Sequence, residues 1–396
     1  MIKSLKTEKL FGRFDYDFQT KEGGVTIVTG PNGFGKSTIL QIINAIGNRK
    51  IAYFLGLEFR VIKSTFDNGE SVTIEKKDDE ISINGVHLSL KLIDRLNYHS
   101  KYPIVLKEFF NFNEIEVNYE DNLEKLNDIL NSMSNWSGKT RLISDQRLIR
   151  RTSKGHEEED PTESVLELPN SLKKIIDEVS SDYSTQANKL DSTYPRRLLT
   201  SKDKIDKATY QDSLHEARKK FLKLKEYNLA EMSLFEDSAF DPNFATALKI
   251  YFDDFFLKYK VFERLISQLD LFTSVLNSRF KFKKIEISRE AGFLIKDSSI
   301  AGRNLPLNKL SSGEKQEILL FFDLIFNTNN DILLLVDEPE LSLHVSWQQQ
   351  FLDDLLKVIK MNNLQVIIAT HSPQILGNHW DKQVDLGELY NGEELN

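Results

Sequence analysis

The sequence contains no cysteine, which excludes disulfide bonds and cysteine-ligated zinc and is compatible with a reducing compartment. It also lacks any apolar run near the ~20 residues that a helix needs to span a bilayer, and the longest, residues 332–336, has the length of a buried strand. Residues 1–8 carry no apolar signal core. The formal net charge of -8 supplies no global basic field for nucleic acid. These absences predict a cytoplasmic protein with no membrane partner, for which DNA binding is possible but not favoured.

A glycine-rich loop at residues 30–38 is the most informative stretch of the chain. Its order, Gly-Pro-Asn-Gly-Phe-Gly-Lys-Ser-Thr, fits the phosphate-binding pattern G-x-x-x-x-G-K-[ST]. The β-branched run at residues 25–28 predicts a buried strand before the loop, and the apolar spacing of residues 37–46 predicts a helix after it. The alternative, a glycine-rich turn that binds nothing, does not explain why the loop and its flanks agree.

Each residue type in this loop suits phosphate chemistry. Glycines let the backbone wrap an anion without Cβ clashes, and the helix N-terminus attracts negative charge. We expect Lys36 to reach the β- and γ-phosphates of ATP and the Ser37 hydroxyl to be a ligand of Mg²⁺. The predicted nucleotide-binding residues of the loop are Gly30, Asn32, Gly33, Gly35, Lys36, Ser37 and Thr38.

Two further predicted strands end in side chains that suit hydrolysis. The run at residues 332–336 delivers Asp337 and Glu338 at the strand end where α/β sheets bind ligands. Asp337 is suited to hold Mg²⁺ and Glu338 to act as general base on the attacking water, the alternative being an acidic turn. His371 follows the strand predicted at residues 365–370, where it would touch the γ-phosphate or that water.

Two more segments suit phosphate chemistry but have ordinary alternatives. Gln146 ends a predicted strand, where it can reach Mg²⁺ or the attacking water as a catalytic residue and metal ligand; a surface amide is equally open. A helix begins with Ser311, Ser312 and Gly313, whose hydroxyls and backbone N–H groups suit a phosphate. An ordinary helix N-cap is the alternative for that segment.

The N-terminal region outside the loop reads as β structure. Residues 2–22 predict a hairpin, and residues 59–90 predict an antiparallel meander. Three aromatic residues of the hairpin, Phe11, Phe14 and Tyr16, either stack on adenine or form ordinary core, and core is the favoured interpretation.

The middle of the chain reads as helical. A polar, acidic segment with two prolines at residues 150–169 predicts a surface loop. Arg196 and Arg197 are expected between two helices, as a solvated basic pair or, less favoured, as a phosphate contact in trans. The helices are predicted at residues 91–98, 123–133, 172–189, 202–233 and 243–276.

Together these segments resemble the ABC-type ATPase family. The matching motifs are Walker A (residues 30–38), the Q-loop (Gln146), the signature (310–316), Walker B with the catalytic glutamate (332–338), the D-loop (339–344) and the switch histidine (His371). Ser312 stands where the family usually has glycine. The resemblance implies an α/β P-loop ATPase head with a mixed or parallel sheet, an N-terminal antiparallel β subdomain and a helical insertion.

The same resemblance implies a division of the chain and an assembly. The N-terminal half of the head would occupy residues 1–150, the insertion 151–278 and the C-terminal half 279–396. The family shares its ATP sites between two subunits, so a dimer or higher homo-oligomer is expected. The signature segment of one copy would then cap the Mg-ATP held by the loop of another.

The wording of the motifs is similar to particular branches of the family. The long gap between Lys36 and Ser312 resembles that of chromosome-maintenance and break-repair ATPases. The motifs D-E-P-E-x-S-L-H-x-x-W-Q and A-T-H-S-P resemble the overcoming-lysogenisation-defect group. The words L-F-G-R-F-D-Y and Y-P-R-R-L resemble ATPases of the PARIS (AriA-like) and Septu (PtuA-like) anti-phage systems.

Such relatives imply a sensor or scaffold ATPase that controls an effector nuclease of the Toprim or HNH type in trans, with a phage protein as trigger. About 20 residues follow the last motif, too few for a nuclease domain, so we expect the effector on another chain. A DNA-repair ATPase that clamps duplex DNA is the alternative, and a transporter subunit is the least favoured of the three.

Overall fold

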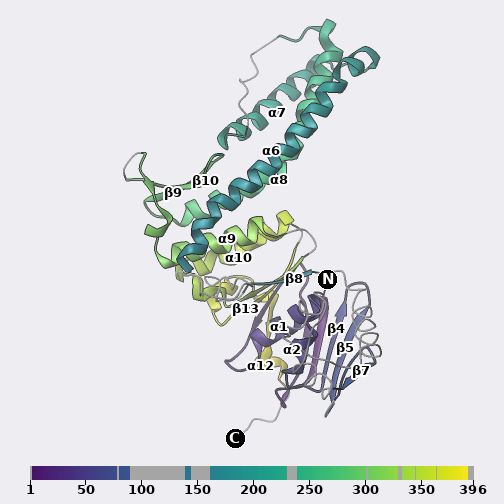
Figure 1. Ribbon diagram of the computed structural model, residues 1–396, viewed down its shortest axis with the longest axis vertical. Helices are drawn as coiled ribbons and strands as arrows, with labels where there is room; N and C mark the ends of the chain where they lie inside the picture. Colours follow the sequence, from purple (N-terminus) through teal and green to yellow (C-terminus); the bar gives the residue numbers. More distant parts are fainter. Residues whose placement is uncertain are drawn as a thin grey trace, which may run out of the picture. The chain divides into compact units, whose positions relative to one another are not determined.

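The computed structural model divides the chain into two compact units (Figure 1). The first comprises Met1–Gln146 and Thr328–Asn396, and the second Arg147–Asn327, so residues 279–327 belong to the same unit as the long helices. The structure describes residues 2–77, 80–89, 139–143, 161–229, 239–299, 302–328, 332–343, 345–362 and 364–390. Three expectations lie outside these ranges: Gln146 and the helices at 91–98 and 123–133.

A six-stranded antiparallel sheet forms the N-terminal part of the first unit, in the order β2-β1-β4-β5-β6-β7. The strands are β1 (Ile2–Leu10), β2 (Phe14–Gln19), β4 (Val61–Phe66), β5 (Ser71–Lys77), β6 (Glu80–Ile83) and β7 (Val86–Ser89). In β2 the residues Phe14, Tyr16 and Phe18 are buried while Asp15 and Asp17 are exposed, the alternation of a strand with one buried face. The predicted hairpin and meander are therefore confirmed as parts of one sheet.

A five-stranded sheet carries the motif strands, and every pairing described in it is parallel. Its order is β14-β3-β13-β12-β8. The strands are β3 (Val25–Thr29), β8 (Lys139–Ile143), β12 (Ile332–Asp337), β13 (Gln365–Ala369) and β14 (Gln383–Asp385). Every residue of β3 and β13 is buried, as expected for parallel strands covered on both faces.

Helix α1 joins the two sheets of the first unit through one hydrophobic core. It contacts β8, β12 and β13, and its buried residues Ile39, Leu40, Ile42, Ile43 and Ile46 belong to a cluster that includes side chains from both sheets. Figure 1 shows α1 and α2 between the sheets. The shorter elements and helices of this unit are α1 (Lys36–Gly47), α2 (Ile51–Leu55), η3 (Pro339–Ser342), α10 (Val345–Asn362), α11 (Pro373–Leu376), η4 (Trp380–Lys382) and α12 (Leu386–Leu389).

The second unit is built from long helices and a three-stranded antiparallel sheet. Helix α8 contacts α6, α7 and α9. It is held to α9 by a fully buried ion pair between Arg279 and Glu317 and by a hydrogen bond of 2.7 Å from Gln268 Nε2 to the Ile325 carbonyl. The elements are α6 (Pro161–Thr200), α7 (Lys207–Glu226), η1 (Pro242–Phe244), α8 (Ala245–Arg279), β9 (Lys283–Ser288), β10 (Gly292–Asp297), β11 (Asn304–Leu305), η2 (Leu307–Lys309) and α9 (Ser312–Phe326).

The loop expected at residues 150–169 is wrong where the structure describes it, because α6 begins at Pro161 and continues through Pro169. Proline is tolerated in a first turn, where the missing N–H has no helical acceptor. Pro169 does interrupt the hydrogen bonding of the helix. However, α6 packs on α8 and β10, and Leu168 and Leu172 on either side of the proline's turn are buried. Tertiary packing therefore carries the helix past the proline.

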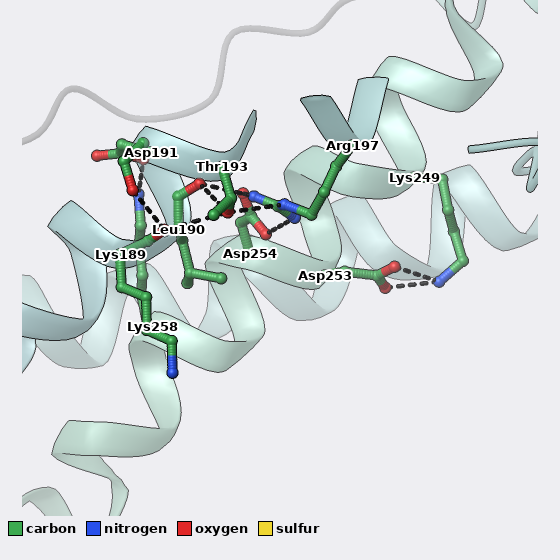
Figure 2. Close-up of polar contacts among 10 residues, drawn as sticks. Lys189, Leu190, Asp191, Thr193, Arg197, Lys249, Asp253, Asp254 and Lys258 are labelled. Atoms are coloured by element: carbon green, nitrogen blue, oxygen red, sulfur yellow. Dashed lines mark hydrogen bonds and ion pairs between the residues drawn. The ribbon is translucent and has the colours of Figure 1, made fainter. Parts of the chain in front are cut away.

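The break expected between two helices at Arg196 and Arg197 is also wrong, because both lie inside α6. Figure 2 shows the Arg197 guanidinium turned toward Asp254 of α8, to which it donates two hydrogen bonds of 2.6 and 2.7 Å. Arg197 therefore forms a bidentate ion pair between α6 and α8 instead of a solvated pair with Arg196. Arg196 is exposed. With these corrections, the predicted α/β class with an antiparallel sheet, a parallel sheet and a helical insertion is confirmed.

Candidate nucleotide site

The glycine-rich loop connects β3 to the N-terminus of α1, as the sequence predicts. Gly30, Gly33 and Gly35 have φ angles of 142°, 83° and 80°, which residues with a Cβ rarely adopt. A Cβ on Gly35 would lie 3.5 Å from the Phe11 ring. Helix α1 has no side-chain cap and no acidic residue in its first turn. Its terminal N–H groups are therefore free of side-chain partners and suited to donate hydrogen bonds to an anion. Asn32 is exposed in the loop beside them.

Lys36 lies where the loop meets the ends of the parallel strands. Its Nζ donates to the carbonyl oxygens of Gly30 and Pro31 at 2.9 and 3.2 Å, and it lies 3.1 Å from His371 Nδ1. Burial lowers the pKa of Lys36, and the negative charge of Glu338 opposes that shift. A buried ammonium with a charged partner in this position suits a phosphate oxygen.

Ser37 on α1 and Asp337 at the end of β12 bring two oxygen atoms that can bind a metal ion close together. The Ser37 hydroxyl donates to Asp337 Oδ1 at 3.0 Å. Hydroxyl and carboxylate oxygens are the hard ligands that Mg²⁺ prefers, and it usually completes its octahedron with phosphate and water. Over the ranges that the structure describes, no group of three or more His, Cys, Asp or Glu side chains could hold a metal alone. The pair therefore fits an ion that arrives with a nucleotide.

His371 lies between Lys36 and Glu338. Its Nε2 is 3.1 Å from Glu338 Oε1, and its Nδ1 faces the Lys36 ammonium. Since an ammonium can only donate, Nδ1 must accept, which leaves the ring proton on Nε2 for the Glu338 carboxyl. Burial and the nearby Lys36 charge lower the pKa of His371, in keeping with this neutral form.

Glu338 combines an unusual backbone with an unusual acidity. Its φ and ψ of 45° and 56° lie in the left-handed region, and its N–H donates to the Ala369 carbonyl at 2.9 Å. Burial, together with a hydrogen bond and negative charge from Glu340, raises the pKa of Glu338 to about 8. A carboxyl with a pKa near neutrality is a stronger base once ionised than a solvated one.

Sequence reasoning missed Glu340 and Gln348, which contact the loop that carries His371. Both lie in sequence motifs quoted above, D-E-P-E and W-Q, but the pattern of residues along the chain does not indicate which backbone atoms their side chains contact. It also missed Asp385 of β14, whose carboxylate accepts from Thr29 Oγ1 at 2.9 Å beside the glycine-rich loop.

The aromatic residues of the hairpin separate into two groups. Phe14 and Tyr16 are buried at 4% and 3% exposure, which matches the core interpretation. Phe11 is 37% exposed and lies against Gly35. Of the three, Phe11 is thus the exposed aromatic residue beside the loop.

The signature segment lies in the second unit, apart from the residues above. Ser311 is the N-cap of α9, and it forms a capping box with Glu314, as the ordinary N-cap alternative expects. Ser312 and Gly313 begin the helix. The first unit thus brings together Lys36, Ser37, Asp337, Glu338 and His371, whereas Ser311, Ser312 and Gly313 belong to a different body and Gln146 lies outside the described ranges.

Comparison with known proteins adds relatives of two kinds. Endonuclease GajA of Bacillus cereus (strain HuB5-5) is 25% identical over 395 residues, which cover 89% of this chain and 52% of GajA. Retron Ec83 probable ATPase of Escherichia coli is 33% identical over 125 residues, 29% of this chain and 22% of that protein. The chain therefore spans about half the length of GajA and about a fifth of the retron ATPase.

Solved structures include the Smc head domain of Pyrococcus furiosus bound to the C-terminal domain of ScpA. It is 13% identical to this chain, and the match covers 95% of this chain and 91% of that structure with a TM-score of 0.40. In the described part of the chain, every helix is too short or too polar to cross a membrane. The family model named AAA ATPase domain (AAA_15) matches residues 9–376. The match spans most of the chain and contains the whole cluster around Lys36, and the chain belongs to this AAA ATPase domain family.

Proposed function

We propose that the chain binds Mg-ATP at the cluster around Lys36 and hydrolyses it. The observation that carries this proposal is a pair of contacts between separate stretches of sequence: His371 lies 3.1 Å from both Lys36 and Glu338, and Ser37 donates to Asp337 at 3.0 Å. A glycine-rich loop that held no nucleotide would not need an acidic pair and a histidine at the neighbouring strand ends.

In this proposal each side chain has one task. The loop N–H groups and Lys36 hold the phosphates, and Thr38 follows on the first turn of α1. Ser37 and Asp337 would hold Mg²⁺, which supplies charge neutralisation at the phosphates. Glu338 takes a proton from the water whose oxygen bonds to the γ-phosphorus, the bond from that phosphorus to the bridging oxygen breaks, and ADP leaves; His371 orients the water.

The exposed ring of Phe11 is the proposed platform for the adenine base. It lies against Gly35. The neighbouring Phe14 is buried in the core, and the Arg13 guanidinium lies 5.4 Å from the centroid of its ring. An exposed aromatic beside a phosphate loop is suited to stack on a base.

We further propose that two copies share each ATP site. The α9 N-terminus of one copy, with Ser311, Ser312 and Gly313, would cap the γ-phosphate held by the loop of the other. Its support is that the start of α9 matches the signature motif of the resemblance and belongs to a different unit from the glycine-rich loop.

The biological role that we propose is control of an effector nuclease in trans during anti-phage defence. One relative is named an endonuclease and another a retron ATPase, and the matched parts make up 52% and 22% of those two proteins. The competing role, a clamp on duplex DNA, predicts binding that weakens steeply with salt, and the net charge of -8 argues against it.

The first test is ATP hydrolysis by wild type and Glu338→Gln, with light scattering after size exclusion. We expect wild type to hydrolyse ATP with Mg²⁺, and Glu338→Gln to bind ATP, lose on the order of 100-fold or more in kcat, and accumulate as an ATP-bound oligomer. Glu75→Gln, on the exposed face of β5, is the matched control and should behave as wild type. Full hydrolysis by Glu338→Gln would overturn the assignment.

The role in defence needs a separate test in cells. Phage plaquing is compared on cells that carry the native locus, the locus with Glu338→Gln and the locus with each neighbouring gene deleted in turn. Protection that survives Glu338→Gln, or that survives every one of the deletions, would contradict the proposed control of an effector nuclease.

A further inference from the structure

Glu340 organises the loop that follows β13. Its Oε1 accepts three hydrogen bonds from consecutive residues: Thr370 Oγ1 at 2.6 Å, the His371 N–H at 2.7 Å and the Ser372 N–H at 3.0 Å. Bonds to a carboxylate are shorter and stronger than bonds between neutral groups. One side chain therefore fixes the backbone on both sides of the His371 Cα.

Gln348 of α10 completes the support from the other side. Its Nε2 donates to the carbonyl oxygens of Leu343 and Glu340 at 3.2 and 3.3 Å, and its Oε1 accepts from the Ser372 hydroxyl at 2.7 Å. The side chain is 9% exposed. The turn after β12, the start of α10 and the loop after β13 are thereby tied into one polar network.

The network determines where the His371 ring points. That ring is 39% exposed and touches Lys36 on one nitrogen and Glu338 on the other, each at 3.1 Å. Both contacts would be lost by a small rotation of the backbone, because a half-exposed side chain has little packing to hold it. Such a displacement of about 1 Å can cost on the order of 100-fold in rate.

We propose that Glu340 and Gln348 are positioning residues that hold the His371 ring in place between Lys36 and Glu338. The inference rests on the proposed ATPase function and adds to it two residues that touch neither phosphate nor water. Both hold the loop that carries His371, and Glu340 also contacts Glu338, so their loss lowers kcat while the binding of ATP to the loop is retained.

Variants of Glu340 separate positioning from simple loss of packing. Glu340→Ala removes all three acceptor contacts, and kcat should fall about 10- to 100-fold with KM for ATP within about twofold of wild type. Glu340→Gln keeps an acceptor oxygen of the same reach, so it should retain activity within about tenfold of wild type. Gln348→Ala should resemble Glu340→Ala in the kcat–KM split with a smaller loss.

The matched control is Gln365→Ala, at the opposite end of β13. It also removes a buried hydrogen-bonded amide, whose Nε2 donates to the Ile2 carbonyl at 3.0 Å, but it does not contact the His371 loop. Thermal unfolding of all variants is recorded beside the kinetics. Gln365→Ala should lower stability without the selective fall in kcat.

A double-mutant cycle with His371→Ala decides the proposal. If Glu340 acts through His371, adding Glu340→Ala to His371→Ala costs less than about threefold more in kcat. An undiminished penalty in the His371→Ala background would overturn the positioning role.

A second readout is independent of hydrolysis. The imidazole NMR signal of His371, assigned by its absence in His371→Ala, is compared between nucleotide-free wild type, Glu340→Ala and Gln365→Ala. It should shift in Glu340→Ala alone. If neither wild type nor any variant hydrolyses ATP but the signal shifts, the proposed ATPase function is wrong and the coupling of Glu340 to His371 stands. If the signal does not shift, the coupling is wrong, whatever the hydrolysis rates are.

Discussion

Glu338 shows how a single residue can carry strain for the sake of its position. Its left-handed backbone costs on the order of 1–3 kcal/mol for a residue with a Cβ. The hydrogen bond from its N–H to the Ala369 carbonyl helps to hold that conformation. The strained backbone turns the carboxyl toward His371 and Glu340 instead of continuing the direction of β12.

The raised pKa of Glu338 predicts a pH dependence of stability. The folded protein binds this proton up to about pH 8, whereas the unfolded chain releases it near 4.5. Stability therefore falls as pH rises through that interval, because only the folded state still holds the proton there. Denaturation midpoints measured in EDTA from pH 5 to 9 should decline in wild type relative to Glu338→Gln. Parallel profiles of the two proteins would contradict the shift.

At this scale the sequence predicts residues that act within one contiguous motif. Lys36, Ser37 and Asp337 lie where their motifs place them. The prediction for Arg197 was wrong because its partner, Asp254, is on another helix. An ion pair between two helices produces no periodic pattern in the sequence. Glu340 was missed for the same reason, since its three donors follow a different strand.

Helix α6 shows why the boundaries of elements are harder to predict. Proline is the strongest local helix breaker, so two prolines in a polar segment favour a loop. The segment instead packs closely on β10, where Gly292 leaves room for it: a Cβ there would lie 1.9 Å from the Pro169 carbonyl oxygen. This contact joins residues far apart in sequence, so local propensity cannot anticipate it.

That contact predicts a sharp difference between two glycines. Gly292→Ala adds both a clash with Pro169 and a strained φ of +78°, so it should destabilise the protein by about 2–4 kcal/mol. Gly302→Ala is the control, because its φ of +79° is the same but no atom lies within 4 Å of its Cβ. It should cost only about 1–2 kcal/mol. Equal losses in denaturant unfolding would show that α6 does not approach β10 so closely.

On the scale of the molecule, the helical unit is inserted between two strands that lie side by side. β8 precedes the insertion and β12 follows it, yet Leu334 pairs with Arg141 in parallel register. The order of motifs made the α/β head predictable, because both ends of the chain carry its signals. The extent of the second unit was not predictable, since α9 packs with α6 and α8, which are far from it in sequence.

A shared site predicts recovery of activity on mixing two inactive variants. Lys36→Ala removes the phosphate lysine, and Ser312→Arg blocks the cap that one copy offers the other. Mixed in equal amounts, they should recover about a quarter of wild-type activity, because half of the dimers are mixed and each has one intact site. Lys36→Ala mixed with Glu338→Gln is the control and should recover nothing. Activity of Ser312→Arg alone would argue against the shared site.

The strand that leads into the glycine-rich loop lies between β13 and β14, and Val25 pairs with Val366, about 340 positions later. During translation β3 is synthesised long before β13 and β14, so it cannot pair with either strand until they have been made. At about 5–20 residues per second, that wait is on the order of 20–70 s. The cluster around Lys36 therefore cannot assemble on the nascent chain until His371, about 340 positions after the strand, has been made.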